Sequence, residues 1–146
     1  MEDQVLDRVE FTVESGKIGE FTRATLVLDP VHQDEAAACD AGFSARAATP
    51  THVVVAGHYR DQQAMVAALE LDLHRVVVGS VRWTYARALV AHDHLVGTRR
   101  VLADERRAAR DATTMRLVTL ETEYIDQAGS PVVWTREVII ERGRPE

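Results

Sequence analysis

Apolar and polar residues alternate with a period of two through the second half of the chain, a pattern typical of half-buried β-strands. From Arg75 onward, Val77, Val81, Trp83 and Tyr85 fall on one side of such an alternation. Three further strands are expected: one from Leu95 to about Asp104, one with Val118, Leu120 and Tyr124 on a shared face, and one with Val132, Trp134, Val138 and Ile140 on a shared face. Residues 127–131 supply the turn between the last two. Four long strands in succession predict an antiparallel sheet.

The first half of the chain carries helix signals instead. After a possible short strand over residues 11–13, two short helices are predicted: one capped by Ser15 and running to Ala24, and one over residues 35–41, capped by Asp34 or Gln33 and ended by Gly42.

A longer apolar element begins at Thr49-Pro50-Thr51 and runs to about Leu69. As a helix it would span roughly 27 Å. The valines over residues 53–55 would also suit a strand, but strands seldom reach this length, so a helix is favoured. The whole chain, residues 1–146, is therefore expected to form one α+β domain in which a curved antiparallel sheet wraps around a long central helix.

Composition narrows the class of function. The net charge of −6, with 17 basic and 23 acidic residues, argues against nucleic-acid binding, which usually needs a basic stripe. Cys39 is the single cysteine, so no internal disulfide forms, and its alanine-rich surroundings suggest a small buried thiol. No apolar run is long enough to cross a membrane, and the acidic N-terminus lacks a signal core. A cytoplasmic protein without cofactor or metal is expected.

Three stretches in this order resemble the MaoC-like hydratase/dehydratase family, which has the hot-dog fold. They are Val13-Glu14-Ser15-Gly16-Lys17-Ile18-Gly19-Glu20-Phe21, then Asp29-Pro30-Val31-His32-Gln33-Asp34-Glu35-Ala36-Ala37 ending in Gly42-Phe43, and Arg82-Trp83-Thr84-Tyr85-Ala86-Arg87-Ala88-Leu89-Val90-Ala91-His92-Asp93. The resemblance covers nearly the whole chain and implies an acyl-thioester substrate, carried by coenzyme A or by an acyl carrier protein.

The second stretch carries the family's catalytic motif, in which an Asp and a His act on the two carbons of the bond that gains or loses water. His32 keeps the histidine position, whereas Val27 occupies the position of the aspartate and can neither hold water nor accept a proton. Asp29 stands two residues too late and would need a rearranged loop to serve. The resemblance implies His32 and Asp29 as the candidate catalytic residues.

The entrance to the central element also departs from the active members of the family. These donate a glycine N–H to the thioester oxygen, but the corresponding residue here is Pro50, which has no N–H. Losing one such donor costs about 3–4 kcal/mol where it has been tested. This entrance resembles the non-catalytic partner subunits of heterodimeric dehydratases. An accessory or catalytically degenerate subunit is therefore the leading hypothesis, acting as a homodimer or as a heterodimer with a catalytic hot-dog subunit.

A second hypothesis is a divergent enzyme on the same scaffold, such as a thioesterase or a biosynthetic dehydratase or cyclase. His58 and Asp61, three residues apart on the expected helix, would then replace the lost pair. Thr51, His52 and Tyr59 complete the candidate substrate-binding residues. A third hypothesis is a binding module without turnover.

Other polar clusters have simpler interpretations. His92-Asp93-His94 lacks a third ligand at metal-binding spacing and suits a solvated turn. The arginines at 99, 100, 106, 107 and 110 alternate with acidic residues and suit a solvated hairpin tip more than a phosphate site. Trp83 and Trp134 suit packing or an interface.

Overall fold

The computed structural model describes residues 3–143. Its elements are β1 (Val5–Thr12), α1 (Ser15–Ala24), the 3-10 helix η1 (Pro30–His32), α2 (Glu35–Asp40), the 3-10 helix η2 (His52–Tyr59), α3 (Gln62–Ala68), η3 (Leu73–Arg75), β2 (Val76–Tyr85), β3 (His94–Ala108), β4 (Thr114–Ile125) and β5 (Pro131–Glu141).

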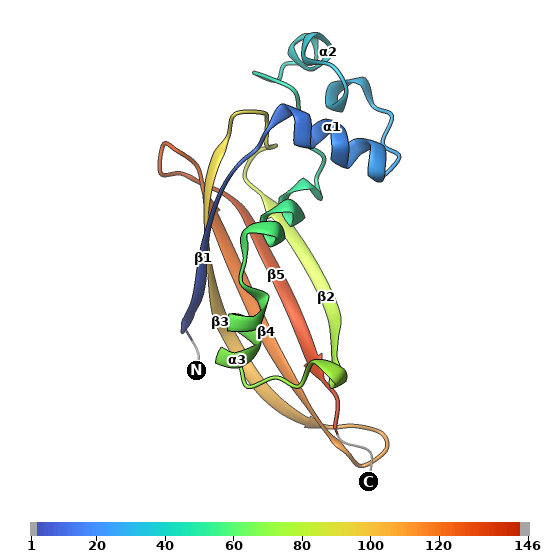
Figure 1. Ribbon diagram of the computed structural model, residues 1–146, viewed down its shortest axis with the longest axis vertical. Coiled ribbons are helices and arrows are strands. Elements are labelled where there is room, and N and C mark those ends of the chain that lie inside the picture. The colour runs from blue at the N-terminus through green and yellow to red at the C-terminus, as the bar shows by residue number, and fades with distance from the viewer. Residues whose placement is uncertain (1–2, 144–146) are drawn as a thin grey trace.

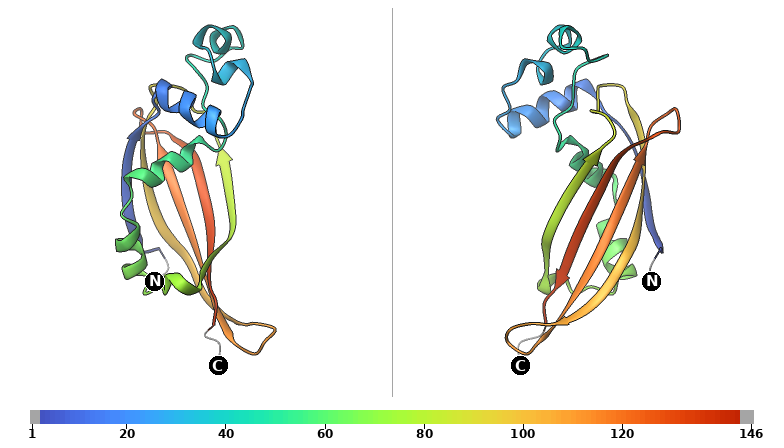
Figure 2. Two further views of the ribbon diagram at one scale, coloured as in Figure 1. Left: turned by 45° about the vertical axis from the view of Figure 1, so that its right-hand side comes forward. Right: turned by 180° about the vertical axis from the view of Figure 1, so that it is seen from behind.

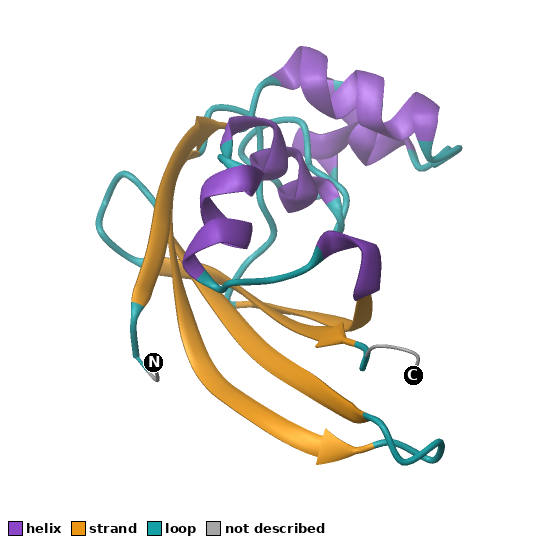
Figure 3. Ribbon diagram, turned by 60° about the horizontal axis from the view of Figure 1, so that its bottom comes forward, coloured by secondary structure: helices purple, strands orange, loops and turns teal. Residues whose placement is uncertain are grey.

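One five-stranded antiparallel sheet in the order β1-β3-β4-β5-β2 curves around η2 and α3, as the sequence predicts for a hot-dog fold (Figure 1). All helices lie on the concave side, and α1 and α2 form a cap over one end of the sheet (Figures 2 and 3). The first strand is longer than expected, because β1 pairs with β3 along most of its length. The two edges of the sheet are β1 and β2.

The central element is not the single helix that the sequence predicts. It divides into η2 and α3 at Arg60, whose backbone is extended (φ −98°, ψ 146°). Asp61 then caps α3 by accepting a hydrogen bond from the Ala64 N–H at 2.9 Å. The β-branched run in η2 is a poor helix former, and the break lets the Arg60 side chain turn toward the sheet, where it bonds Asp7 and Tyr124.

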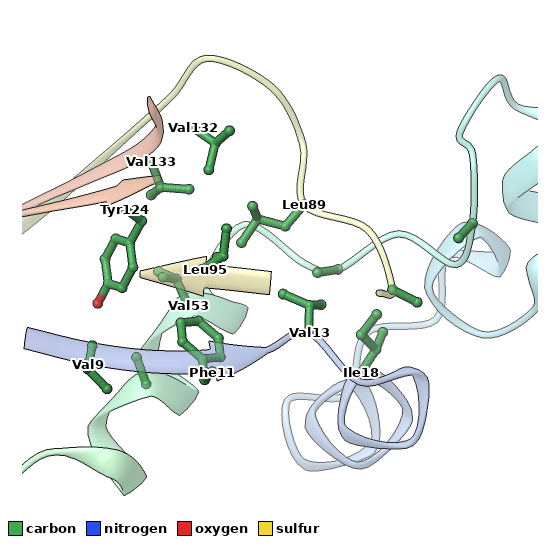
Figure 4. Close-up of a cluster of buried hydrophobic side chains, with 14 residues drawn as sticks. Val9, Phe11, Val13, Ile18, Val53, Leu89, Leu95, Tyr124, Val132 and Val133 are labelled. Carbon is green, nitrogen blue, oxygen red and sulfur yellow. The ribbon is translucent and has the colours of Figure 1, made fainter. Parts of the chain in front are cut away.

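Two buried clusters fill the space between this element and the sheet. The larger joins β1, α1 and η2 to the upper part of the sheet through Phe11, Ile18, Val53, Leu95 and Tyr124 (Figure 4). The smaller packs Met65 and Leu69 of α3 against Val101, Val118 and Leu120. The predicted shared face of Val118, Leu120 and Tyr124 is confirmed, since all three are buried.

The predicted faces of the two remaining strands need correction. On β5 the inward residues are Val133, Thr135, Glu137 and Ile139, so Trp134, Val138 and Ile140 point outward. On β2 the register shifts between Val78 and Ser80, which places Val77 on the face opposite Val81, Trp83 and Tyr85. The inward face of β5 was predicted wrongly because apolar residues occupy both faces of this strand. Cys39 is exposed on α2, not buried.

The helix boundaries of the first half largely follow the prediction. Asp34 caps α2 as expected, and Gly42 follows its end with a positive φ of 96°. Ser15 is the first residue of α1, and Glu14 occupies the N-cap position without a side-chain bond.

Candidate functional site

A groove of about 410 Å³ lies between the central element and the inner face of the sheet, on the side toward β2. Its apolar lining comes from Val53, Val54, Met65, Val78, Val81 and Ile139, and its polar lining from Arg60, Trp83, Arg99, Thr122, Tyr124, Thr135 and Glu137. The volume falls within the range usual for small-molecule sites. The groove exists because η2 and α3 pack near β1, which leaves the inner face of β5 and β2 less covered.

One row of residues crosses the whole sheet in register at the level of this groove. Asp7 of β1 faces Arg99 of β3, Arg99 faces Thr122 of β4, Thr122 faces Thr135 of β5, and Thr135 faces Trp83 of β2. Residues paired in this way share a face of the sheet. We call these five residues the polar row. Apolar or aromatic residues dominate the neighbouring inward positions, such as Val133 on one side and Leu120 on the other.

The β1 end of the polar row is closed by ion pairs. Asp7 accepts hydrogen bonds from both Arg60 and Arg99, whose side chains are only 7% and 5% exposed. Arg60 also donates to the Tyr124 hydroxyl at 3.2 Å. Burial raises the pKa of that hydroxyl, so Tyr124 stays protonated at neutral pH.

The rest of the polar row holds polar atoms that lack partners. The Arg99 Nε, the Trp83 Nε1 and the Thr135 Oγ1 are buried and make no hydrogen bond within residues 3–143. Two of these atoms are donors only, and the hydroxyl can donate or accept. A buried polar group without a partner costs about 1–3 kcal/mol. The groove is therefore mainly apolar along its length, and the residues across its middle carry buried polar groups without partners.

His32 is the last residue of η1, which packs against α1 and α2, and a backbone carbonyl fixes the orientation of its ring. Its Nδ1 is 2.8 Å from the Ala47 carbonyl oxygen, so Nδ1 carries the proton and Nε2 is left as an acceptor. Arg46 holds the same segment by donating to the His32 carbonyl at 2.7 Å and to the Ser15 carbonyl at 3.1 Å. A histidine held in this way is suited to accept a proton at Nε2.

The other two positions of the motif, Asp29 and Val27, are engaged in local hydrogen bonds. Asp29 is exposed and accepts a hydrogen bond from the Val31 N–H at 3.1 Å, which caps η1. The half-buried Val27 uses its carbonyl to accept from Gln33 at 2.6 Å. No carboxylate is among the hydrogen-bond partners that the described residues give His32.

The entrance to η2 is fixed by Tyr85, whose hydroxyl donates to the Pro50 carbonyl. Burial raises the pKa of Tyr85 to about 12, so the phenol remains a donor. Thr51 is exposed beside it. His52 points into the core, 1% exposed, with its ring edge against Phe21 at 5.5 Å between centroids. Burial lowers the pKa of His52 to about 4, so it is neutral under most conditions.

His58, Tyr59 and Asp61 are all exposed and do not line the groove. Tyr59 stacks on Phe11 at 6.3 Å, and the Asp61 carboxylate caps α3. Because the helix breaks at Arg60, His58 and Asp61 do not share one helical face, and the premise that made them a pair is wrong.

Two of the simpler interpretations also change. Asp93 is buried and bonds both Arg87 and the Val90 N–H, so the turn that contains it is a braced one, and only His92 is fully exposed there. Arg99 is buried in the polar row, while Arg106, Arg107 and Arg110 are exposed near the β3–β4 hairpin as expected.

Within residues 3–143 there is no cluster of three potential metal ligands and no helix long and apolar enough to span a membrane.

The polar row was not predicted from the sequence. Its members lie far apart in the chain and come together only through strand pairing. A charged residue inside an apolar alternation, such as Arg99 between Gly97 and Val101, is the one signal that would have pointed to it.

Solved structures with this fold define its class. A HadBC (3R-hydroxyacyl-ACP dehydratase) complex from Mycobacterium tuberculosis superposes with a TM-score of 0.81 at 20% identity, covering 95% of this chain and 96% of that one. The ChsH1–ChsH2 complex from the same organism gives 0.79 at 15% identity, covering 97% and 86%. An (R)-hydratase from A. caviae gives 0.67 at 16%, covering 95% of each. The chain therefore has the hot-dog fold of the MaoC-like dehydratases.

Sequence comparison fixes the family. The FAS1-like dehydratase domain region matches residues 4–135. A UPF0336 protein of Leifsonia xyli subsp. xyli is 33% identical over 91% of this chain and 87% of its own length, and one of Thermobifida fusca is 34% identical over 87% and 81%. The chain belongs to the FAS1-like dehydratase domain family, and the predicted resemblance is confirmed.

Proposed function

We propose that this protein binds acyl thioesters as an accessory, catalytically degenerate subunit of a (3R)-hydroxyacyl-thioester hydratase–dehydratase system. Two observations together carry the proposal: a groove on the concave face of a dehydratase fold, and a separate motif in the first half of the chain that keeps His32 but has Val27 in place of the aspartate. Membership of a dehydratase domain family supports the proposed substrate class, and two structures with the same fold, HadBC and ChsH1–ChsH2, are complexes.

The exposed residues support assembly with a second hot-dog subunit. β2 is an edge strand, and Val78 on it is 66% exposed. Val54 of η2, 49% exposed, lines the groove together with Val78. An unpaired strand edge with apolar side chains is a surface for strand pairing. A partner there would border the open side of the groove.

Hydration of crotonyl- and longer enoyl-thioesters tests the proposal, with the protein alone and mixed with a hot-dog subunit that has an intact Asp–His pair. We expect no turnover alone, faster turnover in the mixture than from the partner alone, and a raised melting temperature with saturated acyl thioesters. Neither binding nor activity in any mixture would overturn it.

The divergent-enzyme hypothesis gains no support from the positions of His58 and Asp61. Both are exposed, and Asp61 is engaged as a cap. It still makes a distinct prediction: turnover by the protein alone that is lost in His58→Ala and kept in His32→Ala.

A further inference from the structure

We propose that the polar row is a binding subsite for a neutral oxygen on the acyl chain, so that the groove selects chains bearing a hydroxyl or keto group over plain alkyl chains. This inference rests on the proposed function for the thioester, but the groove itself supplies the argument. It concerns the interior of the acyl site, away from His32.

The first step is the chemistry of the lining. A plain alkyl chain makes no hydrogen bond, so it would leave the Arg99 Nε, the Trp83 Nε1 and the Thr135 Oγ1 without partners. Arg99 and Thr135 are more than nine-tenths buried, with exposures of 4% and 7%. An oxygen acceptor seated among them would satisfy groups that an alkyl chain cannot.

The second step is the charge balance, which favours a neutral oxygen over a carboxylate. Arg60 and Arg99 already share Asp7, and Glu137 lines the same groove. Two positive and two negative side chains leave no net charge to neutralise an added anion, and burying an unpaired charge is costly. A hydroxyl or carbonyl oxygen avoids that cost.

The third step is access. The ion pairs close the row at β1, whereas the unpartnered Thr135 and Trp83 lie at its other end, on β5 and the edge strand β2. The groove reaches exposed Val54 and Val78 on this side. A chain that enters the groove therefore passes the Trp83–Thr135 pair.

The sheet provides a matched control for this pair. Trp83 faces Thr135 on the inner side, and the next pair along the strands, Thr84 and Trp134, lies on the outer side. There the Trp134 indole donates to Glu123 at 3.1 Å and is not part of the groove. Thr135→Val removes one hydrogen-bonding group at nearly constant shape, and Trp83→Phe removes the indole N–H together with part of the ring. Thr84→Val and Trp134→Phe make the same two changes on the outer side, so each inner variant has a matched control.

Binding is measured by calorimetry, with Trp83 fluorescence in a Trp134→Phe background as a second readout. The probes are dodecanoyl-coenzyme A, a series of its hydroxyl and keto derivatives with the oxygen moved stepwise along the chain, the methyl esters of the same acids, and pantetheine alone. We expect at least one oxygenated chain to bind about 3- to 10-fold more tightly than the plain chain, which corresponds to one hydrogen bond. Thr135→Val and Trp83→Phe should each reduce that preference without weakening the plain chain, and the outer variants should preserve it.

The outcomes separate the two proposals. Binding of the plain thioester with no oxygen preference, or a preference untouched by the inner variants, overturns the subsite and leaves the proposed function standing. Oxygenated methyl esters that bind through the inner pair when no thioester binds would keep the subsite and overturn the thioester function. If only pantetheine loses affinity in the inner variants, the row binds the carrier arm and the acyl subsite is overturned. No binding by any probe overturns both.

Discussion

His32 keeps the histidine position of the proton-transfer pair that the family resemblance implies, and Val27 stands where that pair has its aspartate. The Ala47 carbonyl keeps Nδ1 protonated and leaves Nε2 available, so the histidine retains the tautomer that a general base needs. Asp29 does not replace the missing group in this conformation, because it is exposed and caps η1. Under the proposed function two groups of the family's site are missing: the carboxylate at position 27 and the backbone N–H at Pro50.

Restoring the carboxylate tests this directly. Val27→Asp is expected to raise enoyl-thioester hydration about tenfold above the background of the unmodified protein. An acid–base group supplies about 10²- to 10⁴-fold, but Pro50 still withholds its oxyanion donor. Steady-state kinetics with and without His32→Ala measure the gain. A gain that survives His32→Ala would contradict the assignment of His32.

His52 gives a prediction about pH. Its pKa is about 4 in the folded state and near 6.5 when unfolded, so between these values the unfolded chain binds the proton more strongly. Its contribution to stability is complete above pH 6.5 and falls as the pH drops toward 4, by up to roughly 3 kcal/mol. In His52→Leu, chemical denaturation at pH 7 and pH 4.5 should show a smaller loss than in the unmodified protein. If His52→Leu and the unmodified protein lost the same stability between pH 7 and pH 4.5, the role of His52 would be refuted. The control is His58→Leu, at an exposed position.

The central element and the strands beneath it are joined by Arg60. This residue stands where η2 ends, and its guanidinium contacts Asp7 of β1 and Tyr124 of β4. The ion pair between Arg60 and Asp7 therefore depends on the break in the helix, since an unbroken helix would place the Arg60 side chain differently. Gly97 on β3 leaves room for the Tyr124 ring, because a Cβ at this position would lie 2.5 Å from that ring.

Removing Arg60 should be costly for this reason. Arg60→Ala leaves the half-buried Asp7 with one partner and Tyr124 with none of its observed bonds, and we expect a loss of roughly 3 kcal/mol in the free energy of unfolding. Denaturant unfolding measures it. The control is Arg106→Ala at an exposed position, which should change stability by less than about 0.5 kcal/mol. Equal effects of the two substitutions would show that the buried pair is not important for stability.

At the scale of the whole molecule, the two sheet edges differ in character. β2 presents Val78 and Val81 to an open groove, while β1 is packed by η2 and α3 and exposes Val5 near its start. The β2 edge is therefore the expected site of subunit pairing.

Introducing a lysine on either edge strand tests which edge pairs with a second subunit. Val78→Lys should shift the protein toward monomer, or weaken its affinity for a catalytic partner at least tenfold, because an inward lysine blocks strand pairing. Val5→Lys, on the opposite edge, should leave assembly unchanged. Analytical ultracentrifugation reports both. Loss of assembly in Val5→Lys alone would place the interface on β1.

The sequence by itself determined the class of fold and predicted the departures from the family motif at Val27 and Pro50, because period-two alternation, caps and short motifs are local and can be recognised without knowledge of contacts. It also placed Asp34 and Gly42 at the two ends of α2. Only the tertiary structure decided where the central helix breaks, which face of β5 points inward, and that His58 and Asp61 belong to different helical segments. The polar row belongs to this second group. Asp7, Arg99, Thr122, Thr135 and Trp83 become neighbours through the register of five strands, and register depends on pairing across the whole sheet, which no local pattern contains.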